Sequence, residues 1–229
     1  MPHGTGIAPR SHVWFAMNDL DDLSQDFENA LLSVDRKEAK AVLTRGRERY
    51  AFAELAEHVI STAFERIGKA WDAGDVALSQ VYVSGRIAED VVGEISLPSD
   101  RSRSGQPKIA IALLDDYHML GKRMVYTVVQ ASGFSILDFG RIEVDELFEK
   151  VKDEKIRILL ISTLMLRSAL QIKKLSDLLK EAGLGVKVVV GGAPFRFDAE
   201  LWREVGADAM GFDAADAIRL TTEMMDEAS

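Results

Sequence analysis

Three short polar segments in this chain each follow a run of apolar residues. The first is Asp116-Tyr-His118-Met-Leu-Gly121, which comes directly after the apolar run 109–114 and the acidic Asp115. The second is Ser162-Thr-Leu164 and the third is Gly191-Gly192. A neutral imidazole such as that of His118 can act as a metal ligand or as a base. A carboxylate two residues earlier can bind the other ring nitrogen and so fix its tautomer and basicity.

The remaining residues of these segments are suited to holding a ligand close to the backbone. Gly121 lets the chain pass near a bulky group, and Ser162 brings a hydroxyl to the end of an apolar run. Gly191 and Gly192 leave room for a flat or elongated group against a sheet edge. Singly, each feature also has an ordinary interpretation, as a helix-capping loop, a lone histidine without further metal ligands, or a turn. The three segments together indicate a binding site more strongly than any one of them does alone.

The elements that must position these segments alternate between strands and helices. Strands are expected at 109–114, 135–138, 158–161, 186–190 and 209–210, and helices at 122–131, 145–152, 169–182, 200–205 and 214–225. Such alternation predicts a parallel sheet covered on both faces. Five strands suit the flavodoxin-like order 2-1-3-4-5, in which strands 1, 3 and 4 are neighbours. The three segments, which follow those strands, should therefore converge at one edge of the sheet.

The first part of the chain has a different, purely helical pattern. Leu20, Leu23, Phe27 and Leu31 recur at helical spacing, and Asp35 with Glu38 predicts a capped second helix. A longer stripe, which includes Trp71, ends at Gly74, and a fourth helix from Leu78 to Ile95 is expected to turn residues such as Tyr82 toward the same core. We expect a flexible arm at 1–17, a four-helix bundle at 18–96, a polar linker at 97–107 and an α/β domain at 108–229.

Composition excludes several classes of protein. The 229-residue chain has a net charge of −9, which argues against nucleic-acid binding, because phosphates require a basic surface. No apolar run approaches the length of a membrane span, and no signal peptide is recognisable, so a cytoplasmic location is expected. The absence of cysteine rules out disulfides and thiolate sites and fits a reducing compartment.

The motifs together resemble a known family. Asp-x-His-x-x-Gly at 116–121, Ser-x-Leu at 162–164 and Gly-Gly at 191–192 match the signature of cobalamin (B12)-binding domains, with 40 residues (122–161) and 26 residues (165–190) between them. The stretch 67–83 resembles the helical cap that precedes this domain in methionine synthase and in the corrinoid proteins of methyltransferase systems. The resemblance implies a four-helix bundle cap followed by a Rossmann-type, flavodoxin-like domain with a five-stranded parallel sheet.

The resemblance also implies roles for individual residues. In the family the domain's histidine replaces the cofactor's own base below cobalt, so His118 would be the cobalt ligand and Asp116 its hydrogen-bond partner. Ser162 would contact the displaced base, and Leu164, Gly191 and Gly192 would line the slot for the nucleotide tail. Gly121 completes the cofactor-binding set. The helical cap would cover the upper face. Met119-Leu120 and the Met-Leu-Arg-Ser loop at 165–168 depart from the usual family residues.

By this resemblance the chain is a corrinoid methyl carrier, cycling between Co(I) and methyl-Co(III), and a non-catalytic subunit. Its partners would be a substrate:corrinoid methyltransferase, a methyl-acceptor methyltransferase and a reductive activator, with neither nucleic acid nor membrane. A cobalamin-dependent sensor is the alternative, although such regulators carry an additional DNA-binding domain. In cobalamin photoreceptors, which resemble this pair of modules, a histidine such as His58 is an upper cobalt ligand. The expectation for His58 here is a packing or solvent-facing residue. A receiver domain lacks its strand-3 Asp here, and no G-x-G-x-x-G supports a hydride-transfer enzyme.

Overall fold

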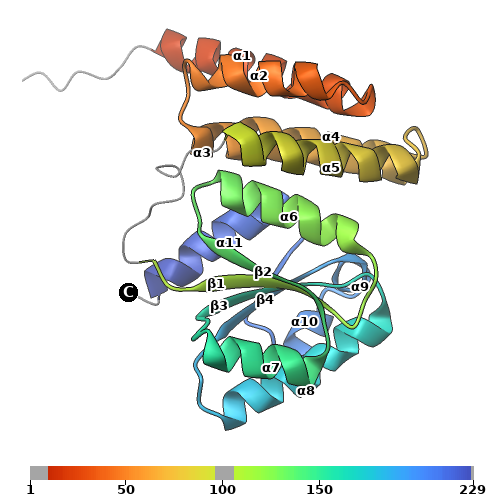
Figure 1. The fold of residues 1–229 in the computed structure, drawn as a ribbon, viewed down its shortest axis with the longest axis vertical. Helices are drawn as coiled ribbons and strands as arrows, with labels where there is room; N and C mark the ends of the chain where they lie inside the picture. Colours follow the sequence, from red (N-terminus) through yellow and green to blue (C-terminus); the bar gives the residue numbers. More distant parts are fainter. Residues whose placement is uncertain (1–9, 96–105, 228–229) are drawn as a thin grey trace, which may run out of the picture.

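The computed structural model describes residues 10–95 and 106–227, and within them a helical bundle precedes an α/β domain (Figure 1). The bundle contains α1 (Arg10–Leu32), α2 (Arg36–Arg47), a long helix assigned as α3 (Phe52–Leu55), η1 (Ala56–Ile60) and α4 (Ser61–Ala73), and then α5 (Leu78–Ile95). This confirms the predicted four-helix arrangement. The expected linker falls largely on residues 96–105, which lie outside the described residues.

The bundle helices begin and end where the sequence indicates, with one exception. Asp35 accepts a hydrogen bond from the Glu38 N–H at 3.0 Å at the start of α2, and Gly74 ends α4 with a left-handed φ of 84°. Helix α1, however, begins at Arg10 and not near Asn18. Residues 11–17 contain neither proline nor glycine, so nothing in them interrupts a helix that starts after Pro9.

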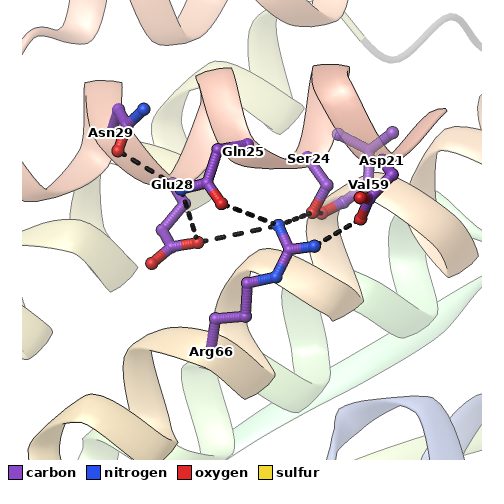
Figure 2. A network of polar contacts seen from close by, with 7 residues as sticks. All are labelled: Asp21, Ser24, Gln25, Glu28, Asn29, Val59 and Arg66. Carbon is purple, nitrogen blue, oxygen red and sulfur yellow. Dashed lines mark hydrogen bonds and ion pairs between the residues drawn. The ribbon is translucent and has the colours of Figure 1, made fainter. Parts of the chain in front are cut away.

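Polar contacts hold α1 against α4 beside the apolar core of the bundle. Figure 2 shows Arg66 of α4 reaching toward α1, where its guanidinium contacts Asp21 and lies 3.7 Å from the carboxylate of Glu28. The hydroxyl of Ser24 donates to the Val59 carbonyl at 3.2 Å. Val59 belongs to η1, a π-helical turn, and such turns leave backbone groups without their usual helical partners. The bond from Ser24 therefore supports the irregular part of the long helix.

The α/β domain has the predicted parallel sheet in the order β2-β1-β3-β4-β5. Its strands are β1 (Ile109–Leu114), β2 (Ile136–Ile142), β3 (Ile158–Ser162), β4 (Lys187–Gly191) and β5 (Ala209–Gly211). Its helices are α6 (Met119–Ala131), α7 (Val144–Asp153), α8 (Leu166–Glu181), α9 (Ala193–Phe197), α10 (Leu201–Glu204) and α11 (Ala214–Glu227). The short helix α9 was not expected. Strand β1 is buried throughout, as a central parallel strand should be.

The molecule is layered, and the bundle is one of its layers. Helices α6 and α11 cover one face of the sheet, while α7 and α8 cover the other (Figure 1). Helices α4 and α5 pack onto the outer side of α6 and α11, and Val128 and Ala214 of those two helices belong to the same apolar core as the bundle. The bundle is thus fixed to the α/β domain by buried apolar surface. No helix within the described residues is both long and apolar enough to cross a membrane.

Candidate functional site

The loop that follows β1 makes a sharp turn at Asp115. This residue has a φ of 45°, in the left-handed region that aspartate tolerates better than most residues. Its N–H donates to the Ile142 carbonyl at 3.0 Å, and its carbonyl accepts a hydrogen bond from the Ser168 hydroxyl at 2.7 Å. The turn is therefore tied to β2 on one side and to α8 on the other. It delivers the next residues to the carboxyl edge of the sheet.

Asp116 is buried and joins two loops of the site. Its Oδ1 accepts hydrogen bonds from the N–H groups of Tyr117 at 2.7 Å and His118 at 3.1 Å, and it lies 2.7 Å from Nδ1 of the His118 ring. Its Oδ2 accepts from the N–H groups of Leu164 at 2.7 Å and Met165 at 2.9 Å. One carboxylate therefore organises both the loop after β1 and the loop after β3.

These contacts determine the charge of Asp116 and the tautomer of His118. Burial by itself would raise the pKa of Asp116, but the hydrogen bonds from Met165, the His118 ring, Leu164 and the His118 N–H outweigh it and hold the pKa well below its ordinary value. An ionised carboxylate only accepts hydrogen bonds, so Nδ1 of His118 must carry the proton. With that proton on Nδ1, Nε2 is the ring nitrogen available for a metal, and the His118 side chain is 52% exposed at the sheet edge.

The other predicted residues come together where β3 and β4 end and α6 begins. Ser162 pairs with Leu113 of β1 on one side and with Gly191 of β4 on the other. A β-carbon on Gly121 would lie 3.5 Å from the Ser162 hydroxyl. These positions belong to α6, β3 and β4, so the sequence motifs that are distant in the chain converge as the strand order predicted.

Gly192 is the position where a side chain is least compatible with the fold. Its φ is 125°, and a β-carbon there would overlap the carbonyl oxygen of Thr163. The loops after β3 and β4 therefore approach each other at backbone distance. The hydroxyl of Thr163 is buried at this point without a hydrogen-bond partner among the described residues.

Sequence reasoning missed one buried charge next to the site. Lys122, one helical turn after His118, is only 1% exposed, and its ammonium donates to both carboxylate oxygens of Asp138 at 2.6 and 2.5 Å. The pair fastens the first turn of α6 to the edge strand β2. Ser168, which holds the turn at Asp115, was also missed. A lysine in a helix is usually read as solvent-facing, and its burial becomes visible only when Asp138 is placed opposite it.

The end of the bundle nearest to the site exposes apolar side chains that the sequence pattern assigned to its core. Trp71 is 41% exposed and Tyr82 is 48% exposed, so both expectations were wrong, and Leu78 is exposed as well. Helical spacing indicates which side of a helix is apolar, and it does not reveal whether another element covers that side. His58 is exposed on η1, in agreement with its solvent-facing interpretation.

This end of the bundle reaches the carboxyl edge of the sheet. Asp72 of α4 lies 3.8 Å from the guanidinium of Arg196 on α9, the helix that follows Gly192. On α5, a β-carbon on Gly85 would lie 3.1 Å from the Leu120 side chain, two residues beyond His118. The exposed apolar side chains of α4 and α5 therefore belong to the part of the bundle that flanks the loops of the site.

Comparison with known proteins agrees with both parts of this architecture. Residues 108–220 match the family model of the B12 binding domain, and residues 23–95 match a second model with the same description. The monomethylamine corrinoid protein 2 of Methanosarcina barkeri is 33% identical over 179 residues, which cover 72% of this chain and 80% of that protein. The dimethylamine corrinoid protein 3 of Methanosarcina acetivorans is 26% identical over 217 residues, with 91% and 100% covered.

A solved structure shows the same fold. The monomethylamine corrinoid protein of Methanosarcina barkeri superposes with a TM-score of 0.67 at 25% identity, over 90% of this chain and 99% of that one. The fold and the matches define a corrinoid-binding protein with a helical cap. The chain belongs to the B12-binding corrinoid proteins of methyltransferase systems, and its cofactor is a corrinoid.

The residues present fit such a cofactor. No cluster of three or more His, Cys, Asp or Glu side chains suited to a metal ion occurs in the described part of the chain. A single protein histidine therefore needs a metal that brings most of its own ligands, as the four ring nitrogens of a corrin do. The His118 ring, whose Nδ1 is held by Asp116, is half exposed at the sheet edge and has Nε2 available for such a metal.

Proposed function

We propose that this protein is a methyl carrier that holds its corrinoid through His118 as the lower cobalt ligand. The observation that carries the proposal is the contact of 2.7 Å between Asp116 Oδ1 and His118 Nδ1, which leaves Nε2 available at the carboxyl edge of the sheet. When bound, the corrinoid supplies a cobalt centre that accepts and releases the methyl group. The protein's own contribution is to position the ligand, to accommodate the cofactor's tail and to limit the access of water.

The lower side of the site has the features that this function requires. Asp116 orients the His118 ring and increases its strength as a donor, as partners of metal-bound histidines generally do. A β-carbon on Gly121 would lie 3.5 Å from the Ser162 hydroxyl, and we assign these two neighbouring positions to the cofactor's displaced base. Leu164 and Gly192 belong to the loops that approach at backbone distance, and Gly191 ends β4. We assign these three residues to the nucleotide tail.

The end of the bundle supports a covering role on the opposite, reactive side. Trp71, Leu78 and Tyr82 are large, exposed side chains at the end of the bundle that flanks the carboxyl edge. Aromatic and aliphatic surface placed over a corrin would exclude water from a methyl group held there. We assign this cover to the ends of α4 and α5 that meet at Gly74.

The expected partners follow from the role of the chain as a cofactor carrier. We assign a cofactor site to this chain and no substrate site of its own. The methyl donor and acceptor are then selected by the two methyltransferases that the carrier visits, with a reductive activator as the third partner. Methylated amines are the donor class that the relatives' names support, because those relatives are corrinoid proteins for mono-, di- and trimethylamine.

Reconstitution tests this function directly. The purified protein is mixed with hydroxocobalamin, passed through a desalting column and examined by visible spectroscopy, and we expect a corrin spectrum to remain with the protein. The reduced holoprotein should then take a methyl group from methyl iodide and give the spectrum of methylcobalamin. A protein that retains no corrinoid, or retains it without accepting a methyl group, would refute the carrier function.

A further inference from the structure

Arg141 and Tyr117 form a stacked pair beside the proposed cobalt ligand. The guanidinium carbon of Arg141 lies 3.7 Å from the centre of the Tyr117 ring. Tyr117 is 73% exposed, although its backbone is held by the hydrogen bond of 2.7 Å from its N–H to Asp116 Oδ1. The pair therefore combines a fixed backbone with an exposed surface immediately next to His118.

A β-bulge in β2 is what brings Arg141 to this position. Asp138 pairs with Ile111 and Arg141 pairs with Leu113, so β2 contains one more residue than β1 between these two pairings. Side chains alternate between the two faces of a strand, and one extra residue reverses that alternation. Asp138 lies on the α6 face, where it binds Lys122. Without the bulge Arg141 would lie on the opposite face, whereas the bulge returns it to the face of α6 and Tyr117.

The bulge is stabilised by contacts of its own. Gly140 has a left-handed φ of 67°, and its N–H donates to Asp138 Oδ1 at 2.7 Å. The same carboxylate accepts both hydrogen bonds from the buried ammonium of Lys122. The bulge that positions Arg141 is therefore held by the contacts of Asp138 with Lys122 and with Gly140.

The guanidinium of Arg141 has unused hydrogen-bonding capacity. Within the described part of the chain its guanidinium stacks on the Tyr117 ring and forms no hydrogen bond or ion pair, although the chain is acidic and Glu143 is two residues away. Most of the other arginines in the described residues form ion pairs, as Arg36, Arg45, Arg66, Arg123 and Arg219 do. A guanidinium stacked on an aromatic ring keeps its N–H donors free at its edge. Arg141 therefore offers donors at the carboxyl edge of the sheet.

We propose that Arg141, held on Tyr117, binds the carbonyl oxygens of the amide side chains at the rim of the corrin. This inference rests on the proposed function, since it places the corrin over His118. In the order β2-β1-β3-β4, Arg141 lies on the β2 side of the His118 loop, and Ser162 and Gly191 lie on the β3–β4 side. Arg141 accordingly meets the ring periphery, and the nucleotide tail occupies the other side.

Binding titrations with a set of corrinoids test this assignment. The dissociation constants of cobalamin, of cobinamide, which lacks the nucleotide, and of cobalamin monocarboxylic acids, in which one rim amide is a carboxylate, are measured by visible spectroscopy. The proteins are the wild type, Arg141→Met, Tyr117→Val and Arg157→Met. Arg157 is an exposed arginine directly before β3, at the opposite edge of the sheet, and serves as the matched control.

We expect Arg141→Met to weaken cobalamin and cobinamide binding alike, by on the order of 10-fold, because hydrogen bonds to charged groups are worth somewhat more than neutral ones. Tyr117→Val should weaken both in the same direction, and Arg157→Met should not. At least one monocarboxylic acid should bind the wild type more tightly than cobalamin does, and Arg141→Met should abolish that preference. A general loss of stability would not produce this dependence on the charge of one rim group.

Two results would overturn the assignment. If Arg141→Met weakens cobalamin but not cobinamide, Arg141 contacts the nucleotide tail and not the ring. If it binds every corrinoid as the wild type does, the pair has no role in cofactor recognition. Both results leave the proposed function intact provided that the wild type binds cobalamin, whereas a wild type that binds no corrinoid refutes the proposed function itself.

Discussion

Asp116 and His118 are separated by one residue, and the Asp116 carboxylate lies 2.7 Å from Nδ1 of the His118 ring. The second oxygen of the same carboxylate accepts the N–H groups of Leu164 and Met165, which belong to the loop after β3. A single buried group therefore connects the proposed cobalt ligand to the loop assigned to the nucleotide tail. The position of the histidine and the shape of the cofactor site depend on each other through this carboxylate.

Asp116→Asn should weaken cobalamin binding by roughly 10- to 100-fold, the usual effect of losing the partner of a metal-bound histidine. An asparagine has one accepting oxygen, and its amide group would face either the His118 ring or the N–H groups of Leu164 and Met165. Dissociation constants from visible titrations provide the measurement. Asp115→Asn is the matched control, because it removes the same charge at the neighbouring position and asparagine tolerates the left-handed backbone there. Equal affinities of the two variants would contradict the role given to Asp116.

Gly192→Ala should destabilise the protein far more than Gly74→Ala. Both glycines have positive φ angles, but a β-carbon on Gly74 has no atom within 4 Å, and one on Gly192 would overlap the Thr163 carbonyl. Backbone strain at Gly74 should cost about 1 kcal/mol, and the added overlap at Gly192 should bring the loss to roughly 3 kcal/mol or more. Urea unfolding of the cofactor-free proteins measures both. Similar losses would mean that the loops at Thr163 and Gly192 do not approach at backbone distance.

Asp138→Ala should reduce the free energy of unfolding more than Lys122→Met does. Removal of the carboxylate leaves a buried ammonium without its partner, which typically costs about 3–5 kcal/mol. Removal of the ammonium leaves Asp138, which is 36% exposed and can reach water. The double variant, measured by urea unfolding beside the two single ones, should be more stable than Asp138→Ala alone. The opposite order of the single variants would show that Lys122 is not desolvated.

The sequence was sufficient to predict the features that follow from the alternation of strands and helices and from the order of the strands in the sheet. The apolar runs indicated all five strands, although the prediction of 135–138 missed the second half of β2 (Ile136–Ile142). The order 2-1-3-4-5 then brought Ser162 and Gly191 beside the loop of His118. Features that depend on a contact with a residue distant in the chain could not be predicted from the sequence. The burial of Lys122 requires Asp138 to lie across from α6, and the extra residue near Gly140 appears only when β2 is aligned with β1. Tyr82 was assigned to the core because spacing cannot distinguish a covered face from an exposed one.

Electron paramagnetic resonance of the Co(II) form of the reconstituted protein tests the central claim most directly. If His118 is the lower ligand, the cobalt signal should carry superhyperfine splitting from one nitrogen. Incorporation of ¹⁵N-histidine should change that splitting from triplets to doublets, and His118→Ala should remove the histidine contribution. The exposed His58 provides the control, since His58→Ala should keep the wild-type pattern. A wild-type spectrum that does not respond to ¹⁵N-histidine, or a protein-nitrogen splitting that persists in His118→Ala, would contradict cobalt ligation by His118.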